Sequence, residues 1–371
     1  MVTIRWKLLL LLLTAAPVSA QERIPERPAL PRGADPNAWE SYFDLGMRLA
    51  PQLPARAEAA FYWASRLDPS RAEPLYGRWA AFHLRDIGRW ERYSADDARV
   101  LERRDVIRAD SLRWRAYLRN PFVHRGLDLL LINQLPGHWA EDQATQALIA
   151  YGEGNFARAA DKFGRVASYD PRLALWAVLA NVSARRLPDA TAHLDSMLAR
   201  ARREEARRLT RPDETKEMYE YARGLLLLAQ NDEAEATAAF QRALLENLAF
   251  YPARVQLGEL ALDQGRVAEA VEELKQAAEI APEDGYLQYR LGAALLRVDQ
   301  PAEAVSALRH ASRLEPHYAA VDLLLGVALE GVGETAAAKE AYTRYLSRAP
   351  NTARAERARV EQWLAQHPGD S

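Results

Sequence analysis

Cysteine is absent from the 371 residues of this protein. Its absence excludes disulfides, thiolate metal ligands, cysteine nucleophiles and a lipid-modified N-terminal cysteine. An excess of positive charge is also lacking, because 49 Lys and Arg face 51 Asp and Glu and the formal net charge is -2. Dedicated nucleic-acid-binding domains are usually basic, so we expect no nucleic-acid partner. Hydrophobic residues make up 49% of the chain, which is enough to form a folded core.

Motifs for catalysis and for metal binding are missing as well. The seven histidines show no His-x-x-x-His spacing and no glutamate-containing zinc motif. The chain has no Gly-x-Ser-x-Gly elbow, no glycine-rich phosphate loop and no dinucleotide fingerprint. We therefore expect no metal, no cofactor and no catalytic residue. An enzyme hidden in the irregular segment 72–140 is the alternative.

No hydrophobic run reaches the roughly 20 residues that a membrane span needs. The run at the N-terminus extends only from Leu8 to Ala20, and basic residues precede it while small residues end it. This is the pattern of a secretory signal peptide. We expect residues 1–20 to be cleaved after Ala20 and the protein to be exported to the periplasm or the medium; an uncleaved leader acting as an anchor is the alternative. Residues 21–37 are rich in proline and predict an extended linker.

A repeat of 34 residues fills the second half of the chain. Each unit has a glycine, then an alanine 12 residues later, then a large apolar residue four further on. The glycines are Gly224, Gly258, Gly292 and Gly326; the alanines are Ala236, Ala270, Ala304 and Ala338; the large residues are Phe240, Leu274, Leu308 and Tyr342. Such regular recurrence predicts a stack of identical helical units.

The spacing within a unit predicts a hairpin of two helices. Leu287, Leu291 and Leu295 recur every four residues and form a stripe on one helix face. The glycine allows the second helix to approach closely, since it has no side chain. Asn231, Gly265, Asp299 and Gly333 fall between the two helices of their units. These residue types tolerate the left-handed backbone that reverses the chain.

The pattern resembles the tetratricopeptide repeat (TPR) family over residues 217–250, 251–284, 285–318 and 319–352. The resemblance implies an all-α, TPR-like helix-hairpin solenoid that winds as a right-handed superhelix. The chain departs from the family at the fourth residue of each unit, where a large residue is replaced by a polar one. These polar residues are Glu220, Arg254, Gln288 and Asp322.

The first half shows the same pattern in a degenerate form over residues 38–212. Ala57, Phe61, Ala64 and Pro69 have the spacing of a second helix and its end, and Ala159, Phe163, Val166 and Pro171 repeat it. A further hairpin is expected from Leu173 to Ala201, with Leu187-Pro188-Asp189 as its turn. Residues 353–371 predict a capping helix and tail, because a solenoid must cover the apolar face of its last unit.

In the TPR family, positions 5 and 9 of each first helix line the concave face. These positions predict a binding groove formed by Tyr221, Leu225, Val255, Glu259, Tyr289, Ala293, Leu323 and Val327. The groove suits a hydrophobic segment or an amphipathic helix, whereas the Lys and Asn with which family members grip a C-terminal carboxylate are missing. The alternative is that these side chains only pack between neighbouring hairpins.

We therefore expect a non-catalytic scaffold or adaptor of the cell envelope that binds another envelope protein or peptide segment through its concave face. Self-association through the same face is a further possibility.

The second hypothesis is a glycan- or cell-wall-binding protein that uses the first half, which contains Trp39, Trp63, Trp79, Trp90, Trp114 and Trp139 and an arginine-rich stretch from Arg99 to Arg119. A second such stretch runs from Arg200 to Arg211. Against this hypothesis, most of these tryptophans are expected in the core and both arginine stretches on solvated helix faces.

Overall fold

In a computed structural model, the chain is described over residues 24–90, 112, 115–120, 122, 143–167, 174–206 and 216–367. The helices are α1 (Trp39–Leu49), α2 (Pro54–Leu67), α3 (Ala72–Trp90), α6 (Gln143–Gly152), α7 (Phe156–Ala167), α8 (Ala174–Ser183), α9 (Leu187–Ala206), α10 (Lys216–Ala229), α11 (Glu233–Glu246), α12 (Tyr251–Asp263), α13 (Val267–Ile280), α14 (Gly285–Arg297), α15 (Pro301–Leu314), α16 (Ala319–Gly331), α17 (Thr335–Arg348) and α18 (Arg354–Gln366). No strand occurs in these ranges, which confirms the all-α fold. Within the same ranges, no helix has the length and apolar character needed to cross a membrane.

The four predicted units are the pairs α10–α11, α12–α13, α14–α15 and α16–α17, and each pair packs as a hairpin. The four predicted turn residues have positive φ angles: 62° at Asn231, 73° at Gly265, 56° at Asp299 and 79° at Gly333. Asparagine, aspartate and glycine adopt this left-handed conformation more readily than other residues. The predicted position of each chain reversal is therefore confirmed.

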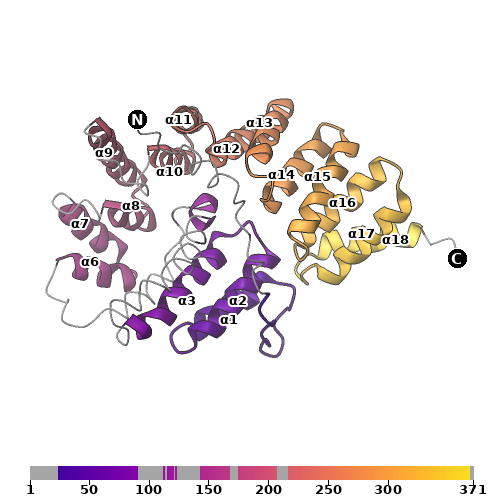
Figure 1. Ribbon diagram of the computed structural model, residues 1–371, viewed down its shortest axis with the longest axis horizontal. Coiled ribbons are helices and arrows are strands. Elements are labelled where there is room, and N and C mark those ends of the chain that lie inside the picture. The colour runs from indigo at the N-terminus through magenta and orange to yellow at the C-terminus, as the bar shows by residue number, and fades with distance from the viewer. Residues whose placement is uncertain are drawn as a thin grey trace, which may run out of the picture.

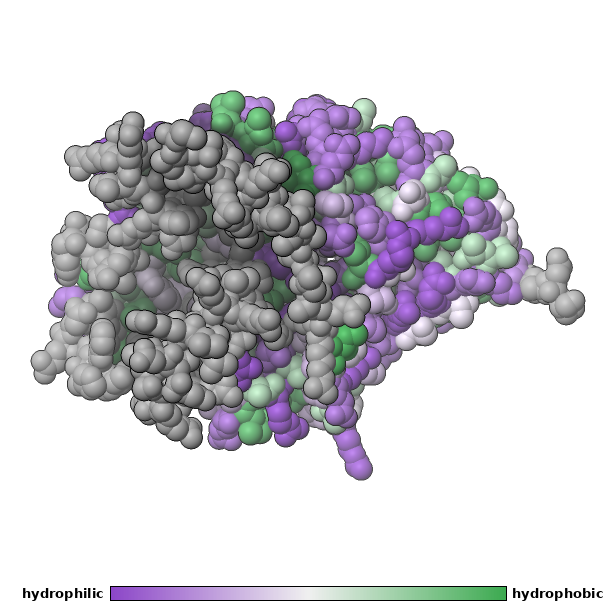
Figure 2. Space-filling view, in the orientation of Figure 1, coloured by the Kyte–Doolittle hydropathy of each residue, from purple (hydrophilic) through white to green (hydrophobic). Residues whose placement is uncertain are grey.

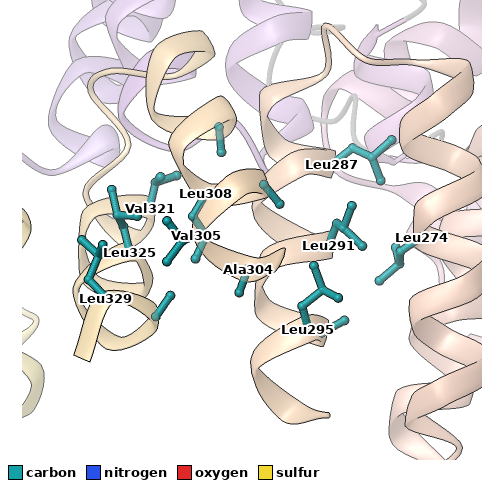
Figure 3. Close-up of a cluster of buried hydrophobic side chains, with 14 of the residues drawn as sticks. Leu274, Leu287, Leu291, Leu295, Ala304, Val305, Leu308, Val321, Leu325 and Leu329 are labelled. Carbon is teal, nitrogen blue, oxygen red and sulfur yellow. The ribbon is translucent and has the colours of Figure 1, made fainter. Parts of the chain in front are cut away.

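The glycine of each unit lies where two helices come closest. A Cβ atom on Gly224 would lie 2.4 Å from the ring of Phe240, and one on Gly326 would lie 2.4 Å from the ring of Tyr342. The leucine stripe of α14 packs into the same interior, beside Ala304 and Leu308 of α15 (Figure 3). At Gly292 the same Cβ atom would lie 2.5 Å from Leu308, so the predicted role is confirmed at these three glycines, whereas Gly258 is less tightly packed, with Leu274 at 3.1 Å.

Of the polar residues at the fourth position of the units, Glu220, Gln288 and Asp322 are buried and Arg254 is partly buried, and all but Gln288 form ion pairs. Glu220 is 1% exposed and lies 3.1 Å from both Arg202 and Arg242. Asp322 is equally buried and pairs with Arg344 at 2.9 Å and Arg348 at 2.7 Å. The third residue, Arg254, pairs with Glu273 at 3.0 Å. Ion pairs between the two helices of a unit thus occupy the place of the large residue in the family.

The first half uses the same packing between helices. Phe61 of α2 lies between the glycines Gly46 and Gly77, and a Cβ atom on either would lie 2.6 Å from its ring. Gly154, with a φ of 78°, reverses the chain between α6 and α7. The turn predicted at Leu187-Pro188-Asp189 is wrong, because the reversal occurs at Arg185 with a φ of 59° and Leu187 already begins α9. Of segment 72–140, only α3, residue 112, residues 115–120 and residue 122 lie in the described ranges.

The helices follow a circular path, from α1–α3 through α6–α13 to α14–α18, and the last repeats return to α2 (Figure 1). Residues 24–37, predicted as an extended linker, contribute to this closure. The Asp35 carboxylate accepts a hydrogen bond from the Asn351 backbone N–H at 2.6 Å, and the Asn37 side-chain amide donates to the Ser347 carbonyl at 3.2 Å. The segment is non-helical as expected, but it packs on both ends of the circle. The predicted signal peptide, residues 1–20, lies outside the described residues.

The predicted capping helix is α18. Val360 is 1% exposed and joins the core of the C-terminal repeats. The Trp363 ring lies 4.9 Å from the Tyr342 ring. These contacts cover α17, and the polar residues on the other side of α18 face solvent.

Candidate binding cleft

The first unit of the predicted groove is covered by the chain itself. Tyr221 is 0% exposed, and its hydroxyl donates to the Leu118 carbonyl at 2.8 Å. Burial raises the pKa of Tyr221 above its ordinary value. Leu225, the second predicted residue of this unit, packs against the same apolar cluster. Tyr221 is therefore not available at the surface, because residues 115–120 lie over α10.

The second unit lines a small cavity. Val255 and Glu259 of α12 face a space of about 140 Å³ that Leu118, Arg119 and Tyr286 also line. Glu259 forms an ion pair with Arg290 of α14. This part of the concave face is hollow, but residues from the first half of the chain bound it on one side.

The third and fourth units present aromatic and aliphatic side chains that are partly buried. The Tyr289 ring stacks on Tyr286 at 6.0 Å and meets Tyr318 edge-on at 5.1 Å. Leu323 and Val327 pack in part against the core of the repeats, and Ala293 is also only partly exposed. Each of these side chains is therefore partly buried in the core and partly accessible, and their role as a groove stays a prediction.

A larger cavity, of about 570 Å³, lies between the repeats and the first half of the chain. One side of it is lined by Arg66 of α2 and by Arg115 and Arg119 of segment 115–120. Asp284 and Glu315, from the loops that connect repeat units, line the other. Two ion pairs join the walls, Arg66 to Glu315 at 3.1 Å and Arg119 to Asp284 at 2.7 Å. Both cavities share Leu118, Arg119 and Tyr251, so together they form one cleft.

The two carboxylates of the cleft differ in their electrostatics. Burial by itself would raise the pKa of Asp284, but Arg119, the Leu287 N–H and Arg115 together outweigh it and the pKa falls below its ordinary value of 3.8. At Glu315 burial prevails over the nearby Arg66, and the pKa rises above its ordinary value. Burial also raises the pKa of Tyr251 to about 12, and its hydroxyl donates to Asp284 at 3.2 Å. Asp284 is thus the stable anion of the cleft.

Several residues of the cleft were not predicted from the sequence. Arg119 belongs to the arginine-rich stretch that was expected on a solvated face, yet its side chain is only 15% exposed. Tyr251 and Asp284 lie at the boundaries between units, where no repeat position marked them. Opposite charges at Arg119 and Asp284 give no signal by themselves, because 165 positions separate the two residues.

The described tryptophans of the first half have partners within the chain. Trp63 is 7% exposed and lies 5.0 Å from the His317 ring. The Arg71 guanidinium stacks over Trp39, and Tyr76 packs on Trp79. The side chains of Trp90, Trp114 and Trp139 lie outside the described residues. These contacts leave the three described rings little free face for stacking on a sugar.

On the face shown in Figure 2, the C-terminal repeats are mostly hydrophilic, with narrow hydrophobic bands between them. Among the described residues, no group of three His, Asp or Glu side chains is placed to hold a metal ion.

A family model and solved structures of other proteins are similar to parts of this chain. A family model described as tetratricopeptide repeat matches residues 221–285 and 289–353. Similar solved structures include a TPR repeat-containing protein from Cytophaga hutchinsonii (14% identity, 60% of this chain and 87% of that chain, TM-score 0.48). YrrB, a TPR protein with an unusual peptide-binding site (17%, 55% and 99%, 0.42), and MamA (14%, 51% and 96%, 0.39) are also similar. No curated protein matches the sequence. Residues 221–285 and 289–353 are therefore tetratricopeptide repeats, and they form the C-terminal part of an all-helical solenoid.

Proposed function

We propose that the protein is a non-catalytic scaffold of the cell envelope that binds a polypeptide segment of another envelope protein in the cleft. The observation that carries this proposal is the cleft itself, where the concave side of α12–α16 faces α2 and residues 115–120. Its walls combine tyrosine rings with paired charges, a mixture suited to polypeptide side chains. TPR units are interaction modules, and neither the sequence nor the described residues supply a catalytic constellation in its place.

Export is the second part of the proposal. It is supported by the signal-peptide pattern of residues 1–20 and is compatible with the absence of cysteine. Mass spectrometry of the protein from its native host tests it. An N-terminus at Gln21 supports cleavage and export, whereas a membrane-bound protein that retains residues 1–20 would replace export with anchoring.

The binding function is tested by crosslinking and capture from the native envelope. The variant Tyr289→Asp with Leu323→Asp places two charges at the predicted concave positions of α14 and α16, and Tyr289 stacks on Tyr286, which lines the cleft. The matched control is Leu245→Asp with Leu248→Asp, because these leucines are 81% and 71% exposed. Both variants are first compared with the wild type by circular dichroism.

We expect one envelope protein to be captured by the wild type and by the control, and lost with the cleft variant. A catch that is the same for all three proteins would contradict binding through the cleft. Loss of the captured protein only with the control variant would mean that the exposed leucines, and not the cleft, form the binding surface.

A further inference from the structure

Residues 115–120 lie on the concave face of the repeats as a bound peptide lies in a groove. Residues 115–119 are helical, and Leu118 is 7% exposed. Leu118 packs in the apolar cluster of α10–α12 with Tyr221, Phe240 and Phe250. An apolar side chain of the segment thus anchors it to the repeats, as in helix-in-groove recognition.

Hydrogen bonds join the segment to α10 in both directions. The Tyr221 hydroxyl donates to the Leu118 carbonyl at 2.8 Å, and the Tyr117 hydroxyl donates to the Met218 carbonyl at 2.6 Å. The acceptor of the first bond is a main-chain carbonyl, so this bond does not depend on the side chain of the segment. Another polypeptide in the same position offers the same carbonyl acceptor.

Arg119 makes three contacts at the other end of the segment. Its guanidinium pairs with Asp284 at 2.7 Å and lies 4.6 Å from the centre of the Tyr286 ring. Its Nε donates to the Pro69 carbonyl at 3.2 Å. Asp284 is only 14% exposed with Arg119 in place, so another segment that covers it in the same way must supply a cation instead of Arg119. The groove therefore selects a positive residue at this place.

We propose that the groove over α10, α12 and α14 is a recognition site for an aromatic–aliphatic–arginine segment, and that Tyr117, Leu118 and Arg119 are its internal occupant. A partner segment of the same chemistry displaces them. This inference rests on the proposed scaffold function and gives the class of the partner: a short helical segment with an apolar residue followed by arginine. Because the internal occupant is tethered, its effective concentration is high, and the wild type disfavours a competing peptide.

The test uses the full chain and a fluorescein-labelled peptide with the sequence of residues 112–122. The variant Leu118→Asp with Arg119→Glu expels the internal segment, and binding of the peptide is measured by fluorescence anisotropy. We expect the variant to bind the peptide about tenfold or more tightly than the wild type does. A peptide carrying the same two substitutions should not bind. If the double variant does not fold, Arg119→Gln replaces it.

Charge reversal identifies the groove as the place of binding. Adding Asp284→Lys to the expelled variant should weaken peptide binding about tenfold or more, because the cation then meets a lysine. Adding Glu340→Lys is the matched control, since this carboxylate is exposed on α17 and does not line the cleft, and it should have little effect. Equal binding by the wild type and the variant, or no binding by a folded variant, would overturn the inference.

The two proposals fail separately. Capture of an envelope protein that depends on Tyr289 and Leu323 while the peptide does not bind would remove only this inference. Peptide binding without any captured protein would leave the groove as a recognition site and remove the scaffold function.

Discussion

Arg66 of α2 and Glu315, which ends α15, form an ion pair at 3.1 Å although 249 positions separate them in the sequence. Beside this pair, the rings of Trp63 and His317 lie 5.0 Å apart. The first hairpin and the last repeats are therefore in direct contact. This contact turns an open solenoid into a closed path and forms one wall of the cleft.

The closure predicts a specific crosslink. Asn37 and Ser347 are joined by a hydrogen bond of 3.2 Å, and the chain has no cysteine of its own. We expect the variant Asn37→Cys with Ser347→Cys to form an intramolecular product with a short bis-maleimide under native conditions, detected by mass spectrometry. Each single variant and the urea-unfolded double variant serve as controls. Absence of the product in the native double variant would mean that the two ends lie apart.

Alanine in place of the repeat glycines should destabilise the protein to different extents. At Gly326 the new methyl group would lie 2.4 Å from the buried ring of Tyr342, so we expect a loss of about 1–3 kcal/mol from overpacking. At Gly258 the nearest atom is Leu274 Cγ at 3.1 Å, and the better helix propensity of alanine, about 0.5–1 kcal/mol, offsets a smaller clash. Urea unfolding measures both variants. Equal effects at the two sites would contradict the close contact with Tyr342.

The ion pairs of Asp322 predict that removing its two arginine partners costs more stability than removing Asp322 itself. Removing both Arg344 and Arg348 by alanine leaves the carboxylate, which is 2% exposed, without a partner and should cost about 3–5 kcal/mol. Asp322→Ala should cost less, about 1–3 kcal/mol, because the arginines are 38% and 34% exposed and can turn to water. Arg309→Ala, which breaks an exposed pair with Glu334, should cost less than about 1 kcal/mol. The reverse order in chemical denaturation would refute this assignment.

Asp284 predicts a dependence of stability on pH. Its pKa is lowered by Arg119 in the folded state, so its contribution is fully present above the ordinary value of 3.8 and is lost as the pH falls through the lowered pKa. We expect the difference in Tm between the wild type and Asp284→Asn to be largest near about pH 7 and to shrink below about pH 4. Glu315, whose pKa is raised mainly by burial, acts in the opposite direction in both proteins, and Asp284→Asn removes only the part of that rise which comes from Asp284. A difference in Tm that does not change with pH would rule out this contribution.

The parts of the fold that follow from local rules could be predicted from the sequence. Asn231 and Asp299 were expected at chain reversals because their side chains tolerate a left-handed backbone, and both have positive φ. The repeat glycines marked the close approach of two helices because glycine has no side chain. Gly46 was missed because it precedes Ala57 by 11 residues, whereas Gly224 precedes Ala236 by 12, so it falls outside the 34-residue register.

The cleft could be predicted only in part, because it depends on contacts between distant segments. Positions 5 and 9 of the repeats identified Val255 and Glu259, which line it. Nothing in the periodicity places Leu118 over Tyr221, since 103 positions separate the hydrogen-bonded residues. Likewise, the prolines of residues 24–37 predicted extended chain correctly but could not show where that chain packs.

A linear array of repeats frays at its ends, because each terminal unit has a neighbour on one side only. In this protein the contacts of α2 with the loops before α16 give the terminal units neighbours on both sides. Thermal unfolding therefore has no terminal unit with a missing neighbour at which it could begin. We expect thermal unfolding in one sharp transition, in place of the gradual loss of helices that an open array of the same units would show.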